Sequence, residues 1–327
     1  MVLRLALWGP LLIGALLAAA YIYLHDPFAR DGTELLQVPL SEDDPSLDRV
    51  GDLQYLGGLD IPRMDQNIGG LSGLRWDAQS GRLLAITDDG RWVWIAPEEN
   101  RGRLVGLEKV ESGPLLNPDG IPFEGKEEGD SESIALTSQG DWLVAFERKH
   151  RVLNYHAGIA APPLATKIDP VKIFGPLDDN RGLETLAAKG GFEIGCVERM
   201  ASDVRPNCII SDGKGGNKPF FVHPPKVLAD VNAAPTDADA LLDGSEALVL
   251  FRSYTPAEGN TAAIVAYAPD GTRREIATFL PPLTLDNFEG LAVREEDGRT
   301  YLYLVSDDNF SGSQRTLLMK FELLQSE

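Results

Sequence analysis

Four segments of the chain place acidic or hydroxyl side chains at matching positions. Each segment begins on Ser or Glu, continues through two β-rich runs joined by a turn, and closes on Thr, Glu or Ser beside an acid or an arginine. The two members of each pair are separated by nearly equal lengths of chain. The pairs are Ser72 with Thr87, Glu132 with Glu147, Glu184 with Glu198, and Glu289 with Ser306. Such self-similarity predicts a repeat architecture in which equivalent residues converge on one place.

Carboxylates that converge repel one another unless a divalent cation, paired arginines or shared protons offset their charge. The basic side chains beside these acids are Arg148, Arg181, Arg199 and Arg252. A site lined by both acidic and basic side chains suits phosphate, carboxylate or sugar groups together with a metal ion. A structural interpretation stays open, because pairs of acids and arginines can also lock neighbouring units together.

The elements that would position these residues are short strands. The chain has 327 residues, 43% hydrophobic, with 33 Gly and 22 Pro, a composition that suits many strands joined by turns. Strong β signals include RLLAIT, WLVAF, ALVLF and TYLYLVS, and they are bounded by turn residues such as Asp270-Gly271 and Asp297-Gly298. We therefore predict an all-β protein, a β-propeller, with a β-sandwich as the chief alternative.

About six blades are expected, because residues 104–122 and 209–225 must also be housed. A fifth and weaker copy of the repeat runs from Asp239 to Phe251 and Arg252. In a propeller the innermost strand of every blade lines the central channel, so one position per repeat forms a ring. Glu132, Glu184 and Glu289 would form that ring with Ser72. Asp88, Glu147, Glu198 and Asp307 would surround it.

The N-terminus resembles a targeting segment. Arg4 precedes an uncharged apolar stretch over residues 5–24, long enough to span a bilayer as a helix. We therefore predict a signal peptide or membrane anchor over 1–24, a connector over 25–52 and the propeller domain over 53–327. The small residues at 18–20 leave cleavage open. Either outcome predicts export to the periplasm, with the inner membrane as a partner if residues 5–24 are retained.

Charge and cysteine content narrow the partners. The formal net charge of -20 argues against nucleic acid, whose phosphates are bound by clustered basic residues. Metal cations and polar small molecules are better partners. The two cysteines, Cys196 and Cys208, bracket a segment with β-rich ends, so we predict a disulfide across a hairpin, with two buried free thiols as the alternative.

Several segments resemble a known family. The motifs GGLSGLRWDAQSGRLLAITDDG, NRGLETLA, DNFEGLAV and LVSDDNF are similar to those of the phytase-like family, described by its esterase-like activity of phytase, which comprises exported bacterial β-propeller proteins. The resemblance runs from about Gly69 to Phe321. It implies a propeller, a phosphoester or ester hydrolase, and calcium as the metal. By motif position it places the family's recurring acids on Asp88, Asp89, Glu132, Glu147, Glu184, Glu198, Glu289, Asp307 and Asp308. The fifth repeat departs from the pattern, since Phe251-Arg252 lacks the acid.

Other hydrolytic chemistries lack their signatures in this chain. The segment Arg148-Lys149-His150-Arg151 misses the Gly and Pro of a histidine acid phosphatase, and no Gly-x-Ser-x-Gly elbow surrounds Ser72 or Ser131. Together with the resemblance, which implies a phosphoester or ester hydrolase and calcium, this favours metal-assisted hydrolysis of a small phosphoester or ester, with catalytic acids Glu132, Glu184 and Glu289. Arg148, Arg181, Arg199 and Arg252 would bind the substrate, and Asp88, Asp89, Glu147, Glu198, Asp307 and Asp308 the calcium.

Two alternatives come from other classes. The chain could be a non-enzymatic envelope propeller that binds a sugar, a peptide or a partner protein, because the fold alone does not determine function. A sugar-lactone or quinoprotein-like dehydrogenase shares the propeller, but the sequence contains no recognisable cofactor motif for it.

Overall fold

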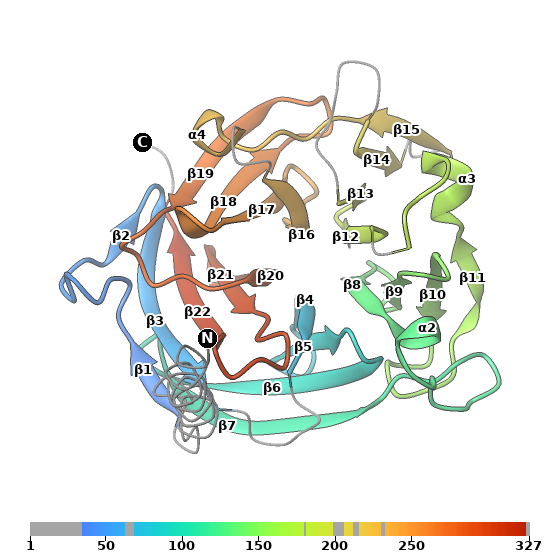
Figure 1. Ribbon diagram of the computed structural model, residues 1–327, viewed down its shortest axis with the longest axis horizontal. Coiled ribbons are helices and arrows are strands. Elements are labelled where there is room, and N and C mark those ends of the chain that lie inside the picture. Colours follow the sequence, from blue (N-terminus) through green and yellow to red (C-terminus); the bar gives the residue numbers. More distant parts are fainter. Residues whose placement is uncertain are drawn as a thin grey trace, which may run out of the picture.

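The computed structural model describes residues 35–62, 69–179, 181–198, 206–211, 216–229 and 233–324. Within these ranges the strands form five antiparallel sheets arranged around a central axis, as expected for a β-propeller (Figure 1). Four sheets are continuous in sequence and run from an innermost to an outermost strand. They comprise β4 (Leu71–Asp77), β5 (Arg82–Thr87), β6 (Arg91–Asn100) and β7 (Arg103–Pro114); β8 (Ser131–Leu136), β9 (Trp142–Phe146), β10 (Arg151–Tyr155) and β11 (Leu164–Ile168); β12 (Leu183–Lys189), β13 (Phe192–Val197), β14 (Cys208–Ser211) and β15 (Asn217–Phe220); and β16 (Ala234–Ala240), β17 (Ala247–Thr255), β18 (Gly259–Tyr267) and β19 (Arg273–Phe279).

The fifth sheet joins segments from both ends of the described chain. Its strands follow the order β20 (Phe288–Glu296), β21 (Arg299–Ser306), β22 (Thr316–Leu323), β3 (Leu53–Ile61) and β1 (Leu36–Val38), and β2 (Arg49–Val50) pairs with β3. The β3–β22 pairing closes the ring, because the last strand of the chain is hydrogen-bonded to one of the first. The N-terminal part of the domain is therefore integral to the propeller.

The expected six blades are wrong, and five are present among the described residues. The two stretches that suggested a further blade are the outer parts of blades already counted. Residues 104–114 lie in β7, the outermost strand of the first sheet, while 209–211 and 217–220 lie in β14 and β15 of the third. Sequence pattern identifies a strand more readily than the sheet to which it belongs, since pairing is a tertiary choice.

Apolar side chains fill the spaces between adjacent blades. Each blade is covered on both faces by its neighbours, so its middle strands are apolar at successive positions instead of alternating. Every residue of β9 is buried, and five of the six residues of β5 are buried. Around the ring, the innermost strands β4, β8, β12, β16 and β20 lie beside one another and surround the channel (Figure 1).

The predicted turns join adjacent strands. Asp297 and Gly298 connect β20 to β21 with φ of 51° and 74°, the left-handed conformation at both central positions that a tight hairpin turn requires. Three short helices, α2 (Lys126–Gly129), α3 (Pro170–Phe174) and α4 (Lys226–Ala229), lie in connections between described strands. Helix α2 precedes β8 and brings Lys126 to the same end of the channel as the repeat acids.

Cys196 of β13 and Cys208 of β14 face each other in register and form a disulfide, with an S–S distance of 2.05 Å. The predicted helix over residues 5–24 lies outside the described residues. No helix in the described part of the chain is long and apolar enough to cross a membrane. The predicted connector is described from residue 35, and that part carries β1 and β2 and buries Leu40 completely. It is thus part of the propeller and not a free linker.

Candidate functional site

The innermost strand of every blade carries a β-bulge near its first residues. In β8, β12 and β20 the register skips Glu132, Glu184 and Glu289, respectively. A bulge bends the strand and changes the direction of the skipped side chain. The three acids that the repeat predicted as a ring therefore share a backbone feature that the sequence did not reveal. All three line one cavity.

That cavity lies at the mouth of the channel and has a volume of about 830 Å³. Nine carboxylic acids line it against three basic side chains, counted among the described residues. The acids are Asp88, Asp130, Glu132, Glu147, Glu184, Glu198, Asp286, Glu289 and Asp307, and the basic residues are Lys126, Arg148 and Arg252. Neutral polar groups, including Ser72, Thr236, Tyr254, Asn260 and Asn287, complete the wall. The mouth therefore carries a large excess of negative charge.

Three of the acids converge closely. Asp130, Glu132 and Glu147 each place a carboxylate oxygen within 4.8 Å of the others. Neighbouring groups fix two of these carboxylates: the Gly182 N–H donates to Glu147 Oε1 at 2.6 Å, and the Ser72 hydroxyl donates to Glu132 Oε2 at 3.3 Å. This all-oxygen set is the kind of donor that calcium and magnesium prefer. The structure thus groups Glu147, predicted as a metal ligand, with Glu132, predicted as a catalytic acid, and with Asp130, for which no role was predicted.

The electrostatics of this cluster favour a bound positive charge. Burial raises the pKa of Glu132 and Glu184 well above their ordinary values, and the neighbouring carboxylate of Glu147 raises both further. Burial likewise raises the pKa of Glu289 to about 7, although the Arg252 guanidinium opposes that change. The pKa of Asp307 is also raised to about 7 by burial and by the nearby carboxylate of Asp88. Without a cation, these carboxyl groups therefore keep their protons at pH values at which the same groups exposed to water would have lost them.

The basic residues pair with individual acids around the wall. Arg252 contacts Glu289 at 2.8 Å, Arg148 Nε donates to Asp130 at 2.7 Å, and Lys126 contacts Asp88 at 2.5 Å. Arg181 is exposed and does not line the cavity, although its charge lowers the pKa of Glu198 against the larger effect of burial. Arg199 lies outside the described residues.

Two acids predicted as metal ligands, Asp89 and Asp308, are hydrogen-bonded to neighbouring groups and do not line the cavity. Asp89 accepts a hydrogen bond from the Thr87 hydroxyl, and Asp308 Oδ1 accepts from the Gly70 and Phe310 N–H groups at 3.1 and 3.0 Å. By contrast, their sequence neighbours Asp88 and Asp307 line the cavity. Of each Asp-Asp pair, one residue shapes the turn and the other faces the mouth.

The fifth repeat is aligned differently from the prediction. Asp239, predicted as the first residue of this repeat, does not line the cavity. It is buried deeper in the channel, where Lys189 Nζ donates to its carboxylate at 2.6 Å. The residue that the β16 bulge skips is Thr236, which lines the cavity. This blade therefore contributes a hydroxyl where three others contribute a carboxylate. Arg252, from the neighbouring strand, does reach the mouth as predicted.

Several cavity residues escaped the sequence argument. Asp130 stands two positions before the ring residue Glu132, just outside the repeat that runs from Glu132 to Glu147, so the repeat pattern gave it no role. Lys126, Asp286 and Asn287 lie in connections between strands, where the repeat pattern says nothing. Their recruitment depends on how the loops fold over the end of the channel.

Arg148 offers a way to separate function from stability. Its backbone is left-handed, with φ of 53°, a conformation that favours Gly or Asn over Arg. We expect Arg148→Asn to keep the thermal midpoint, because the relieved backbone strain offsets the lost ion pair with Asp130. The variant should raise KM for an anionic ester substrate about tenfold, the typical loss for one charged contact. Calorimetry and steady-state kinetics measure the two effects. Unchanged kinetics would exclude a role for Arg148 in substrate binding.

The family described as "Phytase-like: Esterase-like activity of phytase" matches residues 66–310 of this chain. No curated protein matches the sequence. Among solved structures, a luciferin-regenerating enzyme is similar, with 12% identity, a TM-score of 0.41 and coverage of 77% of this chain and 92% of that one. A putative gluconolactonase has 14% identity, a TM-score of 0.40 and coverage of 90% and 95%. Virginiamycin B lyase from Staphylococcus aureus has 8% identity, a TM-score of 0.38 and coverage of 89% and 99%. These likenesses are too distant to bear on the site.

Proposed function

Because this chain belongs to the phytase-like family, described by its esterase-like activity of phytase, we propose that it is a hydrolase of small phosphoesters or esters assisted by a divalent cation, calcium foremost. The observation that carries the proposal is the convergence of Asp130, Glu132 and Glu147 inside a mouth where acids outnumber basic residues threefold. Such a surplus of partly buried carboxylates is costly unless a cation or protons offset it.

The residues present fit a hard cation. Asp130, Glu132 and Glu147 would hold it, and Glu184, whose pKa the Glu147 carboxylate raises, lies next to that group. When bound, the cation would supply Lewis-acid stabilisation of negative charge on the substrate oxygens. Carboxylate ligands in a partly buried cavity also suit calcium in size and charge.

The chain's own residues supply the remaining chemistry. Glu184 would accept a proton from the attacking water as the water oxygen bonds to the phosphorus or acyl carbon. The ester bond then breaks, and the leaving alkoxide would take a proton from solvent and depart as the alcohol. Arg252 and Arg148, both at the wall, would donate hydrogen bonds to the oxygens on which negative charge develops. Tyr254, whose side chain is 61% exposed at the rim, would contact the leaving group.

A direct assay tests the proposal. The purified propeller would be incubated with phytate, p-nitrophenyl phosphate and p-nitrophenyl acetate, each with calcium and with a chelator. Calcium-dependent phosphate or acetate release is the expected result. Release that persists in the chelator would overturn the role of the cation, and no turnover of any of the three would overturn the hydrolase.

The alternative is a binding propeller without catalysis. It draws support from the pairing of all three basic cavity residues with acids, which is what a purely structural ion network would show. Against this alternative, six further acids line the described wall of the cavity, and each of the three basic residues there is already paired with another acid. Calcium binding without turnover in the same assay would favour this alternative.

For the location, we propose export to the periplasm, with residues 5–24 as a signal or an inner-membrane anchor. The disulfide between Cys196 and Cys208 supports an oxidising compartment. Cell fractionation followed by N-terminal sequencing tests this, and a cytoplasmic protein with an intact N-terminus would contradict it.

A further inference from the structure

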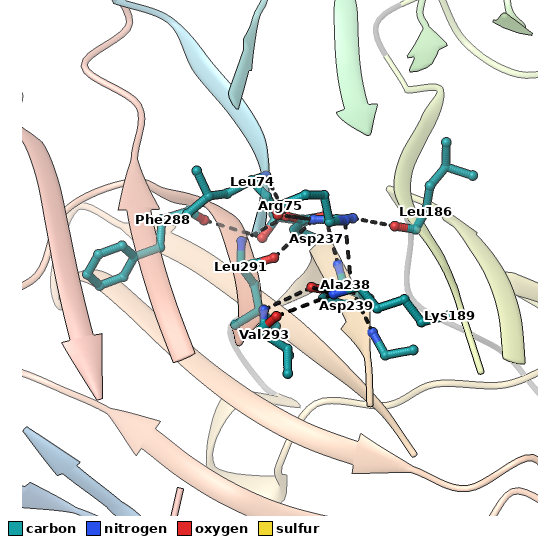
Figure 2. Close-up of polar contacts among 12 residues, drawn as sticks. Leu74, Arg75, Leu186, Lys189, Asp237, Ala238, Asp239, Phe288, Leu291 and Val293 are labelled. Carbon is teal, nitrogen blue, oxygen red and sulfur yellow. Dashed lines mark hydrogen bonds and ion pairs between the residues drawn. The ribbon is translucent and has the colours of Figure 1, made fainter. Parts of the chain in front are cut away.

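A network of charged residues links the innermost strands around the channel (Figure 2). At its centre, the fully buried Arg75 of β4 makes a bidentate ion pair with Asp237 of β16, with both N–O distances at 2.8 Å. A second pair lies beside it, where Lys189 of β12 contacts Asp239 of β16 at 2.6 Å. Neither pair lines the cavity of the candidate site.

The Arg75 guanidinium also joins strands from different blades. It donates to the backbone oxygens of Leu74 on β4, Leu291 on β20 and Leu186 on β12, the contact with Leu291 being 3.0 Å (Figure 2). Asp237 completes the arrangement, because its Oδ2 accepts from the Leu74 and Leu291 N–H groups at 3.2 and 2.8 Å. One ion pair therefore holds four of the five innermost strands among the described residues. The exception is β8.

The backbone groups held in this way have a fixed relation to the mouth. Leu186 and Leu291 each follow a ring carboxylate, Glu184 or Glu289, by two residues, and Leu74 follows Ser72 by the same interval. Two residues span roughly 7 Å of a strand. Thr236, the ring residue of the fourth blade, immediately precedes Asp237 itself. The ion pair thus lies one or two residues along the strand from the ring side chain in every blade that it touches.

The strands approach too closely here for their separation to be set by ordinary side-chain packing. A Cβ on Gly290 would come within 2.8 Å of the Leu74 Cβ and within 3.2 Å of the Gly73 carbonyl carbon. Because the two backbones are in close contact here, a small shift of β4 against β20 changes the distance between their ring side chains, Ser72 and Glu289. The rigid, five-donor fork of arginine is suited to fix several acceptors at once, which a lysine ammonium cannot do.

We propose that Arg75, paired with Asp237, is a positioning residue that sets the spacing of the ring side chains Ser72, Glu184, Thr236 and Glu289 at the mouth. The role rests on the proposed function, since positioning matters only if the mouth binds a cation and substrate. Displacements of about 1 Å commonly cost a hundredfold in rate when they disturb reacting groups.

The test compares Arg75→Lys with Lys189→Met, which disturbs the neighbouring buried pair in the same network. Calcium affinity would be measured by isothermal titration on chelator-treated protein, together with kcat, KM and the thermal midpoint. Arg75→Lys is expected to lower kcat about tenfold or more, because Glu184 and Glu289 stand on strands that the ion pair holds. The calcium affinity should stay within about twofold, because Glu132 stands on β8, the strand outside the network. Lys189→Met should lower the midpoint while keeping kcat within about twofold of the wild type. If kcat falls in both variants in proportion to the midpoint, the role of Arg75 is only structural and the proposal is wrong.

If Arg75→Lys does not fold, Asp237→Asn replaces it, because an amide cannot accept both the Arg75 fork and two backbone N–H groups; unchanged kcat in that variant would overturn the proposal. If the wild type binds no calcium, the proposed function fails by itself. Crystal structures would then decide: we expect Glu184 and Glu289 to move relative to each other by about 1 Å in Arg75→Lys and not in Lys189→Met. Unmoved carboxylates would overturn the positioning role.

Discussion

Replacing Glu184 with glutamine is expected to lower kcat for the best ester or phosphoester substrate by about a hundredfold or more, the usual contribution of a general base. The thermal midpoint should stay unchanged or rise. Burial and the carboxylates of Glu132 and Glu147 raise the pKa of Glu184, so a charged form at this position is costly to the fold. A neutral amide of the same shape removes that cost together with the proton acceptor. Steady-state kinetics and calorimetry on one preparation measure both effects.

The matched control is Glu275→Gln, the same substitution at an exposed position of the outer strand β19. It should change neither kinetics nor midpoint. Glu184→Gln with wild-type kcat would exclude Glu184 as the base. A large drop in both kcat and the midpoint would instead indicate that the carboxylate holds the blade together.

Calcium is expected to stabilise the protein strongly at pH 8 and little at pH 5. The reason is competition, because a carboxylate must lose its proton to hold the cation. At a calcium concentration a hundred times the dissociation constant, the added stability is about 2.7 kcal/mol, or roughly 5 °C in the thermal midpoint for a chain of this size. Scanning calorimetry at matched ionic strength, with calcium or with a chelator, gives the difference as a function of pH.

The direction follows from the pKa values in the mouth. Burial raises the folded-state pKa of both Glu289 and Asp307 to about 7, above ordinary values of 4.5 and 3.8. A raised pKa means that the folded form holds its proton more tightly than the unfolded chain. Its contribution to stability is complete below the unfolded pKa and is lost as the pH rises through the folded one. In the chelator, the midpoint should therefore fall between about pH 5 and pH 8.

With calcium present, the cation replaces the proton on Glu132, whose pKa burial also raises, so the part of the fall that this group causes should disappear. Glu132→Gln removes one of the three converging carboxylates and should abolish most of the calcium response, whereas Glu275→Gln should keep it. Parallel curves with and without calcium across the pH range would contradict a cation site at the mouth.

Much of the site was predictable because the repeat carries its own register. Glu132, Glu184 and Glu289 each stand at the start of a β-rich run, and in each blade that run is the innermost strand. The equivalence of strands in a propeller turns equal sequence positions into a ring, so these acids could be grouped without knowing the blade count. The predicted alignment of the fourth blade was wrong because its ring residue, Thr236, is not acidic, and the nearby Asp239 was aligned with the ring acids instead. Asp239 lies three residues after Thr236 along the strand, at a different depth in the channel.

By itself, the sequence determined that this chain forms antiparallel β repeats whose acids gather at one end, since alternation, turn residues and repeat spacing are local properties. Only the tertiary structure decided which strands pair, and hence that the described residues form five blades, because the sequences of outer strands such as β7 and β14 do not indicate which sheet they join. It also decided that Arg75 meets Asp237, 162 positions away in sequence, and that Lys126 and Asp130 join the acids. Those contacts arise where the ring closes, because a closed ring brings into one channel residues that no sequence interval relates.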